Sequence, residues 1–205
     1  MLNADGAPLY PERKVEQVSY SISTEEGDLL ERLQKFIRER YRAAKSQGQH
    51  SAAFALITLE RRFASSPHAM LQSLIRMKEK IEQRLSNTFV VPSVVSQDED
   101  WIEWEELTED ERWQLEESAE ATVATIFRQK QELENERGQL SRLIGDAETI
   151  VTKRDQAKLR SLKDTCDFWV GENGEQLIVF TEFKDTLEYL VDQIHAWGYS
   201  TATIH

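Results

Sequence analysis

The C-terminal residues 175–205 constrain the fold most, because they place a strand pattern, a helix pattern and another strand pattern in succession. Residues 177–180, Leu-Ile-Val-Phe, form an apolar run that is too short for a helix and typical of a strand buried on both faces of a parallel sheet. A polar turn, residues 181–185, leads into a helix that ends at Gly198, and residues 201–204 begin a second strand. The helix has one apolar stripe, which consists of Leu187, Leu190, Val191 and Ile194. These patterns predict a β-α-β unit whose second strand is just beginning.

The composition favours a helical protein in a reducing compartment. Charged residues make up 30% of the chain, whereas glycine and proline are scarce, and this balance favours a helix-dominated, soluble protein. Cys166 is the single cysteine, which excludes an internal disulfide and suits the cytosol. No stretch reaches the length of a membrane span, and the N-terminus lacks the basic region and apolar core of a secretory signal. We therefore expect a cytoplasmic protein that does not enter a membrane.

Three helices are predicted in the first half of the chain. Alternating apolar residues in 15–22 suggest a short strand, and Ser23 with Glu26 forms a capping-box pattern that starts a helix reaching about residue 46. A second helix covers about residues 50–64, and Ser66-Pro67 restarts a third that reaches Leu85. Their apolar stripes predict that the three helices pack on one another.

Most of the net charge of −12 lies in one segment. Residues 98–120 carry a net charge of about −11, against about +3 for residues 1–97 and about −4 for residues 121–205. Whole-chain charge therefore does not exclude DNA binding. Three tryptophans lie among the carboxylates, namely Trp101, Trp104 and Trp113. Three roles remain open for this segment: packing on the chain's own core, docking of a protein partner, or mimicry of DNA in a basic channel.

Two further helix patterns follow the tryptophans. Thr108 and Glu111 offer a cap for a helix from about residue 109 to residue 126. Residues 131–152 continue as a helix with apolar residues three to seven apart, and their paired charges suggest a solvated hairpin arm or a coiled-coil-like element.

Four segments resemble one helicase family. Residues 177–194, LIVFTEFKDTLEYLVDQI, resemble the opening of the second RecA-like lobe of superfamily-two helicases, at motif IV. The resemblance is strongest to the Swi/Snf-like branch, including bacterial members such as the DISARM-type helicase. Residues 8–41 resemble the join after the first lobe, and residues 56–85 resemble the helical pair that follows it. Residues 155–164 resemble the helix that leads into the second lobe.

The resemblance and the patterns together predict a mainly α fold with a small α/β portion. We expect a lead-in with a short strand (1–22), a helical subdomain (23–86) and an acidic, Trp-containing helical insert (87–155). Residues 156–205 would then form an incomplete RecA-like β-α-β unit, the start of the second lobe.

The motifs of ATP hydrolysis are absent from this sequence. There is no Gly-x-x-x-x-Gly-Lys-Ser/Thr segment to hold nucleotide phosphates, and no Asp-Glu-x-His-type box follows an apolar strand. The four histidines and Cys166 have no zinc-ligand spacing. We therefore assign no catalytic, cofactor-binding or metal-binding residue to this chain; the resemblance implies ATP and magnesium for the parent protein alone.

Two groups of residues are candidates for nucleic-acid contacts. In related motors the turn after the motif IV strand faces the nucleic acid, and the resemblance carries this role to Thr181, Lys184 and Thr186. The alternative is that the two threonines only cap a helix, and Glu182 adds a negative charge that disfavours phosphate. Basic residues of the first three helices form the other group, which alternatively is a solvated helix face: Arg38, Arg42, Lys45, Arg61, Arg62, Arg76 and Lys78.

Two functions from different classes fit this sequence. The first is a fragment of an ATP-dependent Swi/Snf-like DNA helicase or translocase, in which this chain contributes DNA contacts and inter-lobe structure without hydrolysing ATP. The second is a non-enzymatic helical interaction or adaptor protein. DNA is the partner that the first function implies, and the acidic, Trp-containing segment is the candidate docking element for a protein partner.

Overall fold

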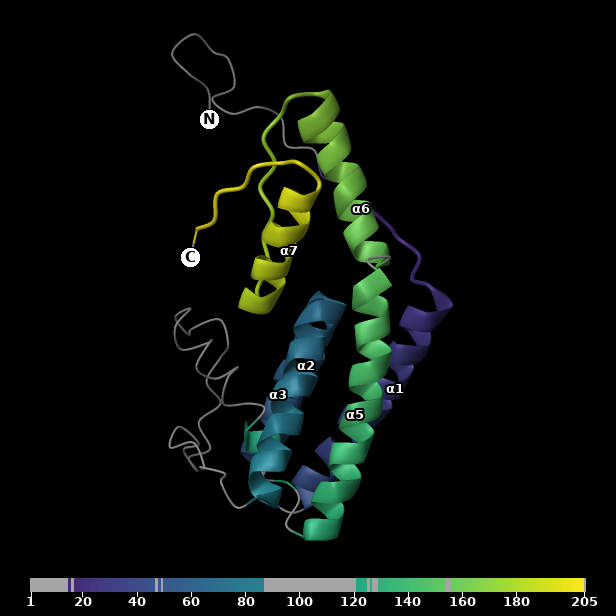
Figure 1. Ribbon diagram of the computed structural model, residues 1–205, viewed down its shortest axis with the longest axis vertical. Coiled ribbons are helices and arrows are strands. Elements are labelled where there is room, and N and C mark those ends of the chain that lie inside the picture. Colours follow the sequence, from purple (N-terminus) through teal and green to yellow (C-terminus); the bar gives the residue numbers. More distant parts are fainter. Residues whose placement is uncertain are drawn as a thin grey trace.

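The computed structural model is mainly helical, as the composition predicts. It describes residues 15, 17–46, 48, 50–86, 121–124, 126, 129–153 and 156–204. Helices α1, α2, α3 and α5 lie alongside one another, α6 continues beyond the end of α5, and α7 lies beside α6 (Figure 1).

Helix α1 spans Thr24–Ser46, and the predicted capping box at its start is confirmed. The Glu26 backbone N–H donates to Ser23 Oγ at 3.1 Å, and the Ser23 N–H donates to the Glu26 carboxylate at 3.0 Å. Two donors that the first turn leaves without helical partners are thereby satisfied. After the helix, Gly48 has a φ of 69°, in the left-handed region that glycine adopts without strain. The start and the end of α1 therefore follow from local chemistry.

Helices α2, His50–Ser65, and α3, Pro67–Leu85, meet at a sharp corner at Ser66. Ser66 Oγ accepts the Ala69 N–H at 3.0 Å, and Pro67 occupies the first turn, where no N–H is needed. Both features were predicted and are confirmed. Helix α2 packs on both α1 and α3, as expected, whereas α3 packs mainly on α5.

Helix α5, Lys130–Lys153, completes the bundle by packing mainly on α3 and also on α1. Its buried residues belong to the same hydrophobic core as those of α1, α2 and α3: Leu133, Leu140, Leu143, Ile144, Ala147 and Ile150. The alternative of a solvated arm is therefore wrong for α5, whose apolar residues contact the bundle. The boundaries predicted around the insert stay predictions.

A buried ion pair joins α1 to α5. Arg40 and Glu136 are each 3% exposed, and Arg40 donates from Nε to Glu136 Oε1 at 3.0 Å and from Nη2 to Oε2 at 2.5 Å. Gln139 Oε1 and the Phe36 carbonyl accept further hydrogen bonds from the same guanidinium at 2.8 and 3.2 Å. The charge is thus surrounded by acceptors, which a buried arginine requires.

The end of the predicted helix near residue 126 packs into the bundle. Residues 121–124 are helical or turn and fully buried, as is Ile126, and the Ala124 carbonyl accepts a hydrogen bond from Arg84 of α3. The three tryptophans, the predicted cap at Thr108 and Glu111 and the whole acidic segment, residues 98–120, lie outside the described residues, so the three possible roles of this segment stay open.

The C-terminal part consists of α6, a π-helical turn and α7. Helix α6, Ala157–Cys166, continues directly into η2, Asp167–Glu172, and α7 spans Lys184–Ala196. Tyr199 packs back on η2 and donates a hydrogen bond to Asp167 Oδ1 at 2.9 Å. Gly171 permits this contact, because a Cβ there would lie 2.7 Å from the Tyr199 hydroxyl.

No described residue belongs to a β-strand, which differs from the predictions for residues 15–22, 177–180 and 201–204. Residues 177–180 are exposed rather than buried on both faces, at 36%, 75%, 38% and 90% in chain order. A strand needs a neighbour that pairs with its backbone, and the described segments supply none here. The exposure nevertheless alternates from residue to residue, as it does in an extended chain whose side chains point to opposite sides.

The packing of α7 also differs from its predicted stripe. Its buried side chains are Thr186, Tyr189 and Gln193, whereas the four apolar residues of the stripe are half-buried. The helix therefore docks on the bundle through a partly polar face, and this face forms the candidate site described below. Among the described helices, none combines the length and the apolar composition that crossing a bilayer requires.

Candidate nucleic-acid interface

The corner between α2 and α3 contacts the start of α7, and this contact brings together the two groups of predicted DNA-binding residues. Arg62 of α2 and Arg76 of α3 both donate to Asp185 Oδ2, the latter at 2.8 Å. Arg62 is 2% exposed, and its guanidinium lies 5.5 Å from the ring centroid of the buried Phe183. One carboxylate thus holds two arginines from two helices, deep in the contact.

Hydroxyl groups form a second polar contact between the corner and α7. Thr186 Oγ1 lies 2.9 Å from Ser65 Oγ and 3.0 Å from Ser66 Oγ, and Thr186 is 4% exposed. Lys158 of α6 donates to the carbonyls of Ala64 and Ser65 at 3.4 and 3.1 Å, at the C-terminal end of α2, where the helix dipole favours a cation. The corner is therefore fixed to both α6 and α7 by polar contacts.

An aromatic stack lies on the other side of the corner. The ring of His68 stacks on Tyr189 at 4.5 Å between centroids with an interplanar angle of 6°. The Tyr189 hydroxyl accepts a hydrogen bond from Gln156 Nε2 at 2.8 Å, within a buried environment. Residues from α3, α7 and the start of α6 thus meet at one point.

The outer edge of the same contact is exposed to solvent. Arg61 donates to Glu182 Oε1 at 2.6 Å, with side chains 44% and 32% exposed. Lys184 is 51% exposed and lies 3.7 Å from Glu188, one turn further along α7. Thr181 is half-buried just before the helix. These three residues form a surface beside the buried arginines, which we call the outer edge: Thr181, Lys184 and Arg61.

The structure thus divides the five predicted contact residues into two sets. Arg61, Lys184 and Thr181 remain accessible to a ligand. Arg62 and Thr186 are buried in contacts between helices of the same chain, so their side chains have no access to a phosphate in this conformation. Their role in nucleic-acid binding stays a prediction that requires α7 to move. The sequence did contain a signal for this pairing. Two adjacent cations, Arg61 and Arg62, lie in one segment, and two acids, Glu182 and Asp185, lie close together in the other.

The remaining basic candidates lie elsewhere. Arg38, Arg42 and Lys45 are exposed on the outer face of α1, opposite its buried stripe, and Lys78 lies 3.9 Å from Glu82 on α3. Their arrangement agrees with the alternative of a solvated helix face.

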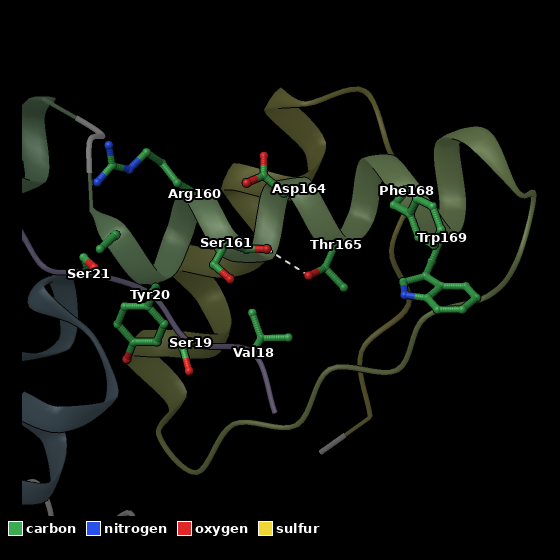
Figure 2. Close-up of a pocket in the computed structure, with 11 residues that line it drawn as sticks. Val18, Ser19, Tyr20, Ser21, Arg160, Ser161, Asp164, Thr165, Phe168 and Trp169 are labelled. Atoms are coloured by element: carbon green, nitrogen blue, oxygen red, sulfur yellow. Dashed lines mark hydrogen bonds between the residues drawn. The ribbon is translucent and has the colours of Figure 1, made fainter. Parts of the chain in front are cut away.

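A shallow groove of about 590 Å³ lies on the far side of α6 (Figure 2). Residues 18–21 form one wall, and the other consists of η2 and of α6, which contributes Arg160, Ser161 and Asp164. The exposed Phe168 and Trp169 lie at one end, with ring centroids 5.0 Å apart in an edge-to-face pair. The groove mixes one cation, one anion, hydroxyls and aromatic rings, and so shows no preference for a charged ligand.

The residues around η2 interact with one another. The Lys163 ammonium donates to Asp167 at 2.5 Å, and this hydrogen bond lowers the pKa of Asp167 and raises that of Lys163. Cys166 is 3% exposed, and burial raises the pKa of its thiol, which disfavours the nucleophilic thiolate. Within the described ranges, no three His, Cys, Asp or Glu side chains are grouped so that they could hold a metal ion.

His68 predicts a specific pH dependence of stability. Burial lowers its pKa from the ordinary value of 6.5, with Asp192 acting in the opposite direction, and its Nδ1 is buried without a hydrogen-bond partner. The folded protein therefore binds fewer protons at His68 than the unfolded chain. The resulting stability is present above the unfolded pKa and is lost as the pH falls through the folded pKa.

We therefore expect lowering the pH from about 7.5 to about 5.5 to decrease the urea midpoint more in the wild type than in His68→Phe. The exposed His195 offers a matched control, since His195→Gln should follow the wild-type curve. Parallel curves for the wild type and His68→Phe would contradict this assignment.

No family model matches this sequence, and no curated protein or solved structure matches it significantly.

Proposed function

We propose that this chain is part of a Swi/Snf-like DNA translocase, in which it forms the inter-lobe helical region and the beginning of the second RecA-like lobe. The observation that carries the proposal is the contact between the α2–α3 corner and α7. It joins residues about 120 positions apart, Ser65 and Ser66 with Thr186, and so links the segment that resembles the helical pair to the segment that resembles the start of the second lobe.

The exposure pattern of residues 177–180 supports the same proposal. These side chains alternate between lower exposure, 36% and 38%, and higher exposure, 75% and 90%, and the segment precedes α7 in the chain (Figure 1). A strand with one bare face is what the first strand of an α/β lobe looks like without the neighbouring strands and the second layer of helices. In the proposed parent protein, ATP and magnesium would be bound by residues of other segments.

Within this proposal the outer edge contacts the sugar-phosphate backbone. Arg61 is a bidentate donor whose geometry suits phosphate, and Lys184 adds a second cation on the neighbouring element. Contacts of this kind do not read sequence and depend strongly on salt. The buried Arg62 and the partly buried Arg76 and Asp185 would hold the two elements at a fixed spacing.

The test measures DNA binding by the purified chain, with the fluorescence anisotropy of a labelled duplex recorded at several salt concentrations. We expect Arg61→Ala and Lys184→Ala each to weaken binding severalfold and to decrease the slope of log K against log salt by about 0.9. Arg137→Ala on the exposed face of α5 removes the same charge elsewhere and is the matched control. Equal effects of all three variants would contradict a localised interface.

The groove beside α6 favours the second candidate, a helical interaction protein. Its two exposed aromatic residues, Phe168 and Trp169, are the kind of anchors that protein interfaces use. Absence of salt-sensitive DNA binding, together with loss of a protein complex in a Trp169→Ala variant, would favour this function over the first.

A further inference from the structure

We propose that Glu182 is a built-in competitor of phosphate at Arg61, so that binding of a polyanion at the outer edge requires this ion pair to exchange. This inference rests on the proposed function, since the polyanion is the nucleic-acid backbone. The inference adds a regulatory contact, in which the Glu182 carboxylate stays paired with the Arg61 guanidinium until a phosphate replaces it.

The geometry of the pair fits an exchangeable contact. Arg61 Nη2 and Glu182 Oε1 are 2.6 Å apart, and both side chains are open to solvent, at 44% and 32%. Exposed ion pairs of this kind contribute little net stability, because water and salt compete with them. A phosphate oxygen accepts from a guanidinium with the same geometry as a carboxylate oxygen, and a phosphodiester in a polymer presents many such groups.

The neighbouring ion pair is not exchangeable in this way. The side chains of Arg62 and Asp185 are 3% and 20% exposed, and the Arg62 guanidinium lies 5.5 Å from the ring centroid of Phe183. Opening it requires α7 to leave the corner and expose Phe183, which is 2% exposed. The outer pair can therefore open by side-chain rotation alone while the inner pair keeps α7 in place.

Charge placement gives Glu182 a second effect. It lies two residues before Lys184, so its carboxylate repels a phosphate that approaches either cation of the outer edge. Glu188 pairs with Lys184 on the other side, at 3.7 Å. Neutralising Glu182 thus both removes the competing carboxylate from Arg61 and removes a like charge from the path of the ligand.

The decisive variant is Glu182→Gln, which keeps the size of the side chain and removes its charge. We expect it to bind a labelled DNA duplex about three- to tenfold more tightly than the wild type at low salt, with the difference shrinking as salt rises. Glu148→Gln changes the net charge equally on the exposed face of α5 and should have almost no effect. In an Arg61→Ala background the gain from Glu182→Gln should largely disappear, because the gain acts through Arg61.

Two results would overturn the inference. One is an equal gain from Glu182→Gln and Glu148→Gln, which would make the effect one of net charge. The other is an undiminished gain in the Arg61→Ala background.

A second measurement separates this inference from the proposed function. Sodium tripolyphosphate is titrated while the side-chain Nε–H resonance of Arg61 is followed by NMR. We expect the resonance to shift at lower tripolyphosphate concentration in Glu182→Gln than in the wild type. If none of the proteins binds the duplex, the result counts against the proposed function. The tripolyphosphate titration then still tests whether Glu182 competes for Arg61, and identical titration curves for the wild type and Glu182→Gln would refute that competition.

Discussion

Replacing Glu136 by alanine will decrease the free energy of unfolding by about 3–5 kcal/mol, the usual cost of leaving one member of a buried ion pair without its partner. Arg40 is 3% exposed and loses two hydrogen bonds in this variant, from Nε and from Nη2. Of its remaining acceptors, Gln139 and the Phe36 carbonyl carry no charge, and the Glu39 carboxylate, 3.2 Å from Nη1, is 49% exposed and so compensates the buried charge less than Glu136 does. Urea denaturation followed by circular dichroism measures the change.

Two controls distinguish this mechanism from a simple loss of packing. The double variant Arg40→Met with Glu136→Leu removes both charges and should recover most of the stability, since an apolar pair of similar volume needs no compensating charge. Asp146→Ala breaks the exposed pair with Arg32, in which the side chains are 52% and 37% exposed, and should cost less than about 1 kcal/mol. A double variant as unstable as Glu136→Ala would show that volume rather than charge decides the outcome.

Replacing Asp185 by alanine will decrease stability by roughly 1.5–3 kcal/mol, the contribution of a hydrogen bond to a charged group. Two arginines share this carboxylate, and Arg62 is buried beside Phe183 with little access to water. The loss should be local as well as global, because Asp185 joins α7 to the bundle. Hydrogen exchange of the α7 amides should therefore accelerate more than that of the α5 amides.

The matched control is Glu188→Ala, one turn further along α7. Glu188 pairs only across the helix surface with Lys184, and its side chain is 63% exposed, so its removal should leave the α7 amides protected. Unchanged exchange of α7 in Asp185→Ala would mean that the apolar contacts of Phe183 and Tyr189 hold the helix without the ion pair.

The helices and their boundaries were predictable because their signals are local. The box of Ser23 and Glu26, the left-handed Gly48 and the Ser66-Pro67 corner each satisfy backbone groups within a few residues. Such contacts form in nearly the same way whatever surrounds the helix. The family resemblance assigns these helices to the region between the two lobes of a helicase, and that assignment stays a proposal.

Two features of the described residues were not predictable from the sequence: the lack of strands where strand patterns occur, and the face through which α7 docks. Both depend on neighbouring segments. Residues 177–180 have the composition of a buried strand, yet they are exposed, since composition cannot supply a pairing partner. The apolar stripe of α7 led to the expectation of an apolar interface, whereas the buried residues are Thr186, Tyr189 and Gln193. Specific polar partners on the α2–α3 corner and α6 outweigh the periodicity there.

The sequence by itself determined a mainly helical chain, the ends of its first three helices and the residues with the chemistry to contact phosphate. Only the tertiary structure decided which of those residues face solvent. Arg61 and Arg62 are adjacent in the sequence and identical in chemistry, yet one is 44% exposed at its side chain and the other 3%. The reason is the helical rotation of about 100° between neighbours, which directs one guanidinium to the outer edge and the other into α7. The partner of Arg62, Asp185, lies 123 positions further along the chain, so only the folded structure brings the two together.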